Sequence, residues 1–225
     1  MNRELLMTED GSFTVSIPEI HTTYHSTRGA IQESEHVFIK TGLKFFTEKN
    51  NNKKTVDIFE MGFGTGLNAL LSFMEAERLQ LKINYTSIEF FPLEPSITSS
   101  LNYHTELQDP GLLFFFGKIH SAQWNTETPI SPRFNLHKQN ADLKSFSTEK
   151  VFDLIYFDAF DPKTQPELWT KEIFEKMFSM LREGGILVTY SSKSEVRKAM
   201  AAAGFSIEKP PGPWGKREIV RATKL

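Results

Sequence analysis

Three acidic residues, Glu60, Glu89 and Asp158, stand where apolar, strand-like segments of the chain end. In an open α/β sheet the ligand crevice lies outside the carboxyl ends of the parallel strands. We therefore expect the three carboxylates to meet at one edge of a sheet. A carboxylate in such a crevice can accept hydrogen bonds from ribose, balance a cationic ligand or take a proton.

A glycine-rich turn separates Glu60 from the segment that follows it. Gly62, Gly64 and Gly66 alternate with other residues, and from Leu67 the apolar residues recur at helical spacing. Alternating glycines permit positive φ and let a ligand approach the backbone, while free N–H groups at a helix start face whatever binds there. The pattern predicts a strand, a nucleotide-type loop and a helix. The alternative is a tight turn that binds nothing.

The spacing of this loop favours one kind of nucleotide. A dinucleotide fingerprint reads G-x-G-x-x-G, whereas here the third glycine comes one residue earlier, and Glu60 disfavours a phosphate. S-adenosylmethionine has a cationic part for Glu60 and a carboxylate or ribose for the loop amides. The pattern E-x-G-x-G-x-G resembles motif I of the Rossmann-like methyltransferases. The residues that we assign to this cofactor are Glu60, Gly62, Phe63, Gly64, Gly66 and Asn68.

Other strand ends supply candidates for the adenosine. Glu89 ends the second strand beside the glycine loop, where its carboxylate can accept both ribose hydroxyls. Asn140 and Asp142 follow the third strand, and either could meet the adenine amino group. Asp142 could instead be the N-cap of a following helix.

Asp158 is the candidate catalytic residue. The segment 151–157 before it is an almost continuous apolar run, typical of a central parallel strand covered on both faces. The DAFDP loop that begins at Asp158 should therefore face the reactive end of the cofactor. Asp161, which precedes Pro162, forms a turn or has a direct role.

The elements that position these residues alternate between strands and helices. Alternation of this kind predicts a Rossmann-like α/β fold with a seven-stranded sheet, an N-terminal β-rich extension and a C-terminal hairpin that adds one antiparallel strand. We expect residues 1–54 to form the extension, with hairpins within 11–39 and a helix over 35–46, and residues 55–225 to form the domain. The expected strands span 55–60, 82–90, 134–138, 151–157, 186–190, 205–209 and 218–223. Residues 105–132 have the least readable pattern, and we expect them to form a packed but irregular insertion before the third strand.

Composition and charge limit the class of protein. The 225 residues are 39% hydrophobic and 24% charged, which suits one ordinary soluble domain. The chain has no cysteine, an N-terminus without a signal peptide's apolar core and no run as long as a membrane span. We expect a cytoplasmic protein with no metal and no membrane partner.

The net charge of −2 conceals a basic C-terminal segment. Residues 191–225 carry eight basic and three acidic side chains, a local charge of 8 − 3 = +5. A basic end on a mildly acidic body suits a polyanionic substrate, and a solvated helix and hairpin is the alternative.

Nearly the whole chain resembles the methyltransferase domain of the MnmC family, which completes 5-methylaminomethyl-2-thiouridine at the tRNA wobble position. The segments that carry the resemblance are 24–39, 60–68 (EMGFGTGLN), 88–93 (IEFFPL), 157–170 (FDAFDPKTQPELWT), 184–192 and 212–218 (GPWGKRE). The resemblance implies a tRNA-modifying, S-adenosylmethionine-dependent N-methyltransferase. It places Glu60, Gly62 and Gly64 at the cofactor, Glu89 at the ribose, Asp158 in the catalytic pocket, and Lys216 and Arg217 on the tRNA side.

If the acceptor is an aminomethyl group on a tRNA base, the remaining candidate residues can be assigned roles in binding it or in removing its proton. Asp158 could accept hydrogen bonds from the ammonium and remove its proton. Phe160 and Trp214 could stack on the target base, because wobble uridine lies in a single-stranded loop; core packing is the alternative for both. Lys163 is either a phosphate contact or simply exposed.

Two features depart from the family. Gln139-Asn140 replaces the usual Gly-Asp before the adenine pocket, and the flavin-dependent domain has no counterpart in these residues. We therefore expect methyl transfer alone, without a flavin, on an aminomethyl group made by other enzymes. The alternatives are an aminopropyltransferase or small-molecule N-methyltransferase of the same fold, and a non-catalytic protein that binds the cofactor.

Overall fold

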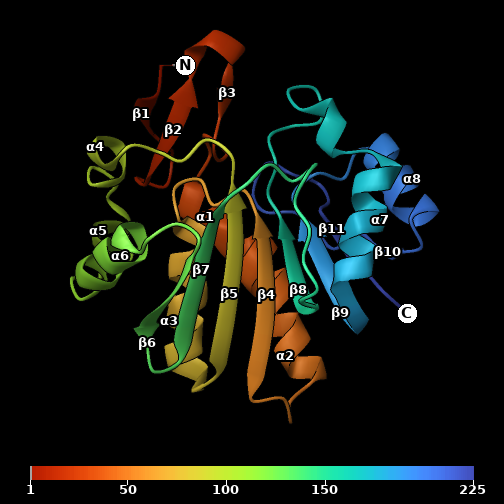
Figure 1. The fold of residues 1–225 in the computed structure, drawn as a ribbon. Helices are drawn as coiled ribbons and strands as arrows, with labels where there is room; N and C mark the ends of the chain where they lie inside the picture. The colour runs from red at the N-terminus through yellow and green to blue at the C-terminus, as the bar shows by residue number, and fades with distance from the viewer. Residues whose placement is uncertain (1) are drawn as a thin grey trace.

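The fold is organised around a mixed sheet, as the computed structural model shows for residues 2–225 (Figure 1). Within those residues the sheet has eight strands in the order β10-β11-β9-β8-β4-β5-β7-β6. Strands β7, β5, β4, β8 and β9 are parallel, whereas β11 is antiparallel to both of its neighbours and β6 is antiparallel to β7. The strands are β4 (Thr55–Met61), β5 (Lys82–Glu89), β6 (Thr126–Ser131), β7 (Phe134–Asn140), β8 (Phe152–Phe157), β9 (Leu181–Thr189), β10 (Ser206–Glu208) and β11 (Val220–Thr223).

The predicted methyltransferase-type fold is confirmed, with one added strand. All seven expected strands are present, and the antiparallel member of the C-terminal pair is β11. The eighth strand, β6, lies at the sheet edge and comes from residues 105–132, so the expectation of an irregular insertion there is wrong. The same segment forms α6 (Leu112–Ser121), which follows the short helices α4 (Pro95–Thr98) and α5 (Tyr103–Glu106).

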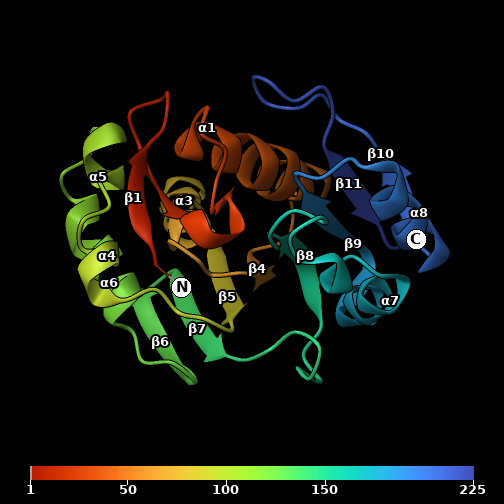
Figure 2. The same cartoon turned by 90° about the horizontal axis from the view of Figure 1, so that it is seen from above.

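Helices cover both faces of the parallel strands, which explains their continuous apolar sequences. In β8, Leu154 and Tyr156 join the core under one set of helices, whereas Ile155 and Phe157 join the core under the other. The first set contains α1 and α3, and the second contains α7 and α8 (Figures 1 and 2). The bounds of these helices are α1 (Ala30–Ser34), α3 (Leu67–Leu79), α7 (Lys171–Met180) and α8 (Ser194–Ala202).

The N-terminal segment forms the expected antiparallel strands, but its helix is longer than expected. Strands β1 (Glu4–Met7), β2 (Phe13–Ile17) and β3 (Thr22–Thr23) form a small antiparallel sheet, and a helix then begins at Ala30. It continues through α1 (Ala30–Ser34), a π-helical stretch over Glu35–Lys44 and α2 (Phe45–Lys49). The helix starts five residues before the expected 35 because Asp10 Oδ2 accepts the Gln32 N–H at 3.1 Å, a cap from a distant residue.

The small sheet lies over the main sheet at the end toward which β5 points (Figure 1), and Figure 2 shows it from above. This position puts β2, β3 and the following residues at the carboxyl ends of the parallel strands. The N-terminal segment is therefore placed to close a crevice there.

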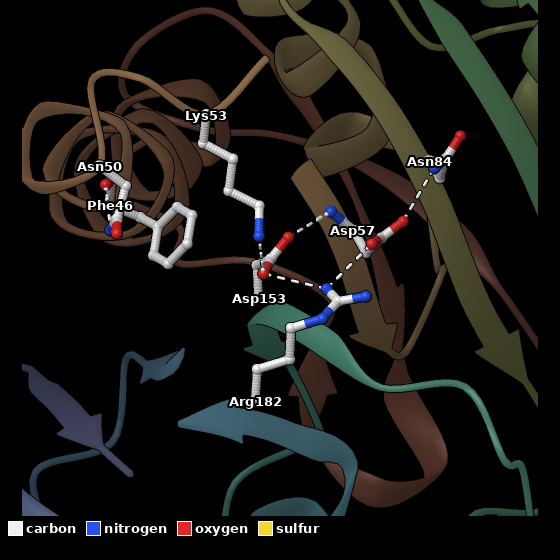
Figure 3. A network of polar contacts seen from close by, with 7 residues as sticks. All are labelled: Phe46, Asn50, Lys53, Asp57, Asn84, Asp153 and Arg182. Atoms are coloured by element: carbon white, nitrogen blue, oxygen red, sulfur yellow. Dashed lines mark hydrogen bonds and ion pairs between the residues drawn. The ribbon is translucent and has the colours of Figure 1, made fainter. Parts of the chain in front are cut away.

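A polar network fixes the opposite end of the sheet (Figure 3). Asp153, 2% exposed, is bound by Lys53 Nζ at 2.6 Å and by Arg182 Nη1 at 3.0 Å. It also accepts the Asp57 N–H at 2.9 Å, and the Asp57 carboxylate meets Arg182 at 2.9 Å. These bonds join β4, β8 and β9 at their amino ends, so their carboxyl ends are held in a defined register beneath the crevice.

Candidate active site

A cavity of about 590 Å³ lies at the carboxyl ends of the parallel strands, a volume in the range of small-molecule sites. The glycine loop, the ends of β5 and β8 and the N-terminal sheet all contribute to its wall. The predicted residues that line it are Gly62, Phe63, Gly64, Asn68, Glu89, Asp142, Asp158 and Phe160. The fold therefore brings together the residues expected at the cofactor, the ribose and the reacting atoms.

Two glycines of the loop permit close contacts with other segments. Gly62 has φ +91°, and a Cβ there would lie 2.7 Å from the carbonyl oxygen of Asp158. Gly64 has φ +49°, and a Cβ there would lie 2.9 Å from Cδ1 of Tyr24. Side chains at either position would push away the Asp158 backbone or the N-terminal segment, as well as straining the backbone.

Glu89 orders the glycine loop as well as lining the cavity. Its Oε2 accepts the Gly64 N–H at 3.0 Å, and its Oε1 accepts the Phe91 N–H at 2.9 Å. The N–H groups of Gly62 and Phe63 bond the Ile88 carbonyl instead of facing the cavity. These two loop amides are therefore not free for a ligand, because the Ile88 carbonyl of strand β5 accepts from both of them. The half-buried carboxylate of Glu89 keeps further lone pairs for hydroxyl groups.

Asp158 sits at the end of β8 with its backbone and side chain both held. Its N–H bonds the Met61 carbonyl at 3.1 Å, and its Oδ2 accepts from Asn68 Nδ2 at 2.9 Å. Burial, reinforced by Glu33, raises the pKa of Asp158 to about 7, although Asn68 and Lys216 act to lower that pKa. Near neutral pH this carboxylate can therefore take a proton and return it.

The residues after Asp158 are fixed by side chains from other elements. The Tyr190 hydroxyl, after β9, donates to the Ala159 carbonyl at 2.8 Å. Trp169 Nε1 donates to the Phe160 carbonyl at 2.8 Å. The backbone after Asp158 is thus held by hydrogen bonds to two consecutive carbonyls.

Phe160 itself is half-buried and lines the cavity. Its ring meets Tyr24 edge-on, with 5.1 Å between the centroids. Phe160 therefore forms a cavity wall with Tyr24, which differs from the alternative of core packing alone.

Glu60 does not reach the cavity, which corrects its expected contact with the cationic part of a ligand. The residue is fully buried beneath the glycine loop, where Ser87 Oγ donates to its Oε2 at 2.7 Å. Within residues 2–225, its Oε1 has no hydrogen-bond partner. Burial, with a contribution from Asp158, raises the pKa of Glu60 to about 8. The side chain is therefore mostly neutral at neutral pH and supports the loop from below.

The structure distinguishes the two residues that are candidates for contact with the adenine. Asp142 lines the cavity, and its Oδ1 accepts the Lys144 N–H at 2.9 Å, so it caps a turn rather than a helix. Asn140 is exposed and outside the cavity wall, because its amide donates to the carbonyls of Glu89 at 2.8 Å and Phe90 at 3.2 Å. The prediction of Asn140 as a cofactor contact is therefore not supported by its position, whereas Asp142 stays a candidate.

Other predicted residues also lie outside the cavity wall. Gly66 is buried at the start of α3. Lys163 is exposed, and the neighbouring Asp161 forms an ion pair with Lys193 at 2.6 Å. This ion pair accounts for the Asp161 carboxylate, so a catalytic role is not needed to explain it.

The expected tRNA contacts lie in the C-terminal segment. Trp214 is 80% exposed, so it does not pack in the core, and Arg217 is exposed as well. Lys216 is half-buried and bonded to the Glu33 carboxylate. The Lys216 ammonium is thus already neutralised, which distinguishes it from a free phosphate contact.

Sequence reasoning missed the contribution of the N-terminal sheet to the cavity. Arg3 donates to the carbonyls of Phe91 at 2.7 Å and Pro92 at 2.8 Å, which ties this sheet to the turn after Glu89. Tyr24 faces the glycine loop, and burial together with Glu89 raises its pKa to about 12. The segment 24–39 is one of those that resemble the family. No local sequence pattern, however, indicates that this segment folds back over the crevice.

Within residues 2–225, no helix is both long and apolar enough to cross a membrane. In the same part of the chain, His, Asp and Glu side chains do not gather into a group that could hold a metal ion.

Comparisons with known proteins agree with this geometry. A family described as S-adenosyl-L-methionine-dependent methyltransferase has a model that matches residues 121–225. The bifunctional protein MnmC of Leptospira interrogans, described for tRNA 5-methylaminomethyl-2-thiouridine biosynthesis, is 29% identical over 96% of this chain and 34% of its own length. The chain thus spans about a third of the length of this curated relative.

Solved structures extend the comparison. The crystal structure of MNMC2 from Aquifex aeolicus covers 100% of this chain and 70% of its own, with a TM-score of 0.80 and 25% identity. Spermidine synthase from Thermotoga maritima covers 99% of this chain and 69% of its own, with a TM-score of 0.53 and 14% identity. The second likeness is one of fold alone.

Proposed function

We propose that this chain, an S-adenosyl-L-methionine-dependent methyltransferase of the MnmC family, methylates the aminomethyl nitrogen of wobble 5-aminomethyl(-2-thio)uridine in tRNA. The observation that carries the proposal is the Asp158 carboxylate, which lines the cavity beside the glycine loop with a pKa raised to about 7. An amine acceptor must lose a proton before or during transfer, and a base with a pKa near neutrality suits that task.

The residues of the cavity fit the cofactor. Glu89 presents a carboxylate on the side of the glycine loop, where ribose hydroxyls could donate to it. Ile88 and Leu143 supply an apolar wall beside Asp142 for an adenine ring. When bound, S-adenosylmethionine supplies an electrophilic methyl group on a sulfonium.

Asp158 then has two tasks toward the acceptor. Its carboxylate would accept hydrogen bonds from the acceptor ammonium and take one proton. The nitrogen lone pair would then be free to receive the methyl group as the methyl–sulfur bond breaks and its electron pair stays on sulfur. The bond from Asn68 and the fixed carbonyl of Ala159 hold the carboxylate in place. Preorganisation of this kind can supply about 7–11 kcal/mol of a two-reactant barrier.

The acceptor reaches Asp158 past aromatic side chains. Tyr24 and Phe160 form one wall of the cavity, and Trp214 is exposed on the C-terminal segment with Arg217 close by in sequence. Aromatic stacking suits a base splayed out of a single-stranded loop, and Arg217 and Lys163 are exposed cations for RNA phosphates. These features favour a nucleic-acid acceptor over a free amine.

The test is transfer of a labelled methyl group to bulk tRNA from cells that lack the modification. Asp158→Asn should lower turnover at least about 10²-fold while S-adenosylmethionine binding stays nearly unchanged. Asp161→Asn makes the same chemical change three residues away and outside the cavity wall, so it should keep turnover within a few-fold. Normal turnover by Asp158→Asn, or labelling of putrescine by the wild type in place of tRNA, would refute the proposal.

A further inference from the structure

The C-terminal segment 210–217 is fastened to the N-terminal helix by two side chains one helical turn apart. Glu33 binds the Lys216 ammonium, and His36 Nε2 donates to the Pro211 carbonyl at 2.8 Å. Glu33 is only 8% exposed, so the ion pair is shielded from water more than an ordinary surface pair. The helix and the segment 210–217 cannot separate without breaking these bonds.

Contacts of the ion pair lead to the Asp158 loop on one side and to the cavity wall on the other. Lys216 Nζ lies 4.3 Å from the centroid of the Tyr190 ring, and the Tyr190 hydroxyl holds the Ala159 carbonyl next to Asp158. On the other side, Glu33 Oε2 accepts the Ser26 N–H at 2.8 Å. Ser26 follows Tyr24 and His25, which both line the cavity.

We propose that Glu33 and Lys216 are positioning residues for the acceptor half of the site, which hold the Asp158 loop in place and balance the charge on its carboxylate. The pair joins the N-terminal segment, the C-terminal segment and strand β9 around one catalytic group. This inference rests on the proposed function where turnover is the readout.

The two members of the pair act on the carboxylate in opposite directions. Glu33 raises the pKa of Asp158, and Lys216 lowers that pKa. Removal of either charge leaves the other unbalanced, whereas removal of both restores the balance. The charged and titratable groups that face Asp158 are Glu60 on β4, Tyr85 on β5, Glu33 on α1, Tyr190 after β9 and Lys216 in the C-terminal segment.

The experiment measures the pH dependence of kcat at saturating cofactor and tRNA. Because Asp158 must be ionised to take a proton, activity rises as pH increases through its pKa. Lys216→Met should move this acidic limb to higher pH, and Glu33→Gln should move it to lower pH. We expect shifts of about 0.5–1 unit, less than an opposite charge in direct contact produces, because Lys216 bonds Glu33 rather than Asp158.

Further variants separate positioning from general damage to the fold. Lys216→Arg keeps the charge and should keep the wild-type profile, and the double variant Lys216→Met with Glu33→Gln should return close to it. Lys209→Met removes a cation from the same segment, where Lys209 pairs with Glu218 at 3.1 Å, and should leave the profile unchanged. Shifts in the same direction for both single variants, or no shift in either, would overturn the proposal.

A readout independent of catalysis is the titration of the Asp158 carboxyl carbon by NMR, with the signal identified by its loss in Asp158→Asn. The pKa read from this signal should follow the same opposite shifts in Lys216→Met and Glu33→Gln. If the wild type methylates no tRNA, the proposed function fails, yet the titration still decides this inference. An Asp158 titration that is identical in all variants would reject it.

Discussion

Nδ2 of Asn68 donates a hydrogen bond to Oδ2 of Asp158 across 2.9 Å. The bond joins the first turn of α3, just after the glycine loop, to the end of strand β8, 90 residues later in the chain. Burial raises the pKa of the Asp158 carboxylate, and this hydrogen bond acts to lower it. One hydrogen bond therefore links the side of the cavity that we propose for the cofactor to the side that we propose for the acceptor.

Removal of this bond should change the pH dependence of catalysis. In Asn68→Ala the charged form of Asp158 loses a donor, so the pKa of Asp158 should rise and the acidic limb of the kcat profile should move to higher pH. Ser72→Ala, on the same helix, removes the Ser72 contact with the Tyr156 hydroxyl at 3.3 Å and serves as the control. An acidic limb that stays in place, or moves to lower pH, would contradict this role for Asn68.

Loss of the Glu89 carboxylate should weaken cofactor binding. Glu89→Ala removes the acceptor for the Gly64 N–H and the proposed acceptor for ribose, so binding should fall by about 1.5–3 kcal/mol, the range for hydrogen bonds to a charged group. Calorimetric titration with S-adenosylmethionine measures the change. Glu127→Ala, on the surface of β6, should bind as the wild type does. Equal affinities for Glu89→Ala and Glu127→Ala would leave Glu89 without a binding role.

A side chain at Gly64 should destabilise the fold by two separable effects. Gly64→Ala strains a residue with φ +49°, at a cost of roughly 1–2 kcal/mol, and its Cβ meets Tyr24 at 2.9 Å. In a Tyr24→Ala background only the backbone strain remains, so the loss of stability from Gly64→Ala should be smaller. Urea unfolding of the four proteins gives both values. The same loss in both backgrounds would show that Tyr24 does not press on the loop.

Glu60 should make stability depend on pH. Its pKa is about 8 in the folded state against an ordinary value of 4.5, so the folded state holds a proton that the unfolded state releases between these values. The stabilisation from this proton is complete below pH 4.5 and is lost as pH rises through 8.

Glu60→Gln removes this titration while keeping the shape of the side chain. The variant should therefore gain stability relative to the wild type as pH increases across that window. Urea unfolding at a series of pH values checks the difference, and a constant difference would mean that Glu60 is charged in the folded protein.

Residues close together in sequence predicted the core of the fold. The change from strand to helical periodicity at Gly62–Gly66 located β4, the loop and α3, because hydrophobic spacing and glycine conformation are local properties. The strand ends at Glu89 and Asp158 were also readable, because a parallel sheet brings its carboxyl ends to one edge. The seven strands, their helices and the place of the cavity follow from these signals.

The direction and the partner of each side chain depended on tertiary contacts. Glu60 carries the same local signal as Glu89, yet packing seals it beneath the loop while Glu89 opens to the cavity. Asn140 and Asp142 are equivalent in sequence, and only the path of the chain after β7 turns Asp142 toward the cavity.

The N-terminal and C-terminal segments meet only in the folded chain. Tyr24 reaches Gly64, and Glu33 binds Lys216 across 183 residues of sequence. Hydrophobic periodicity gives no signal for such pairs, because each side chain reads locally as an ordinary surface residue. The sequence by itself therefore determined the sheet and the edge where the site lies, whereas burial and long-range contacts decided which charges face the cavity and which are neutralised behind it.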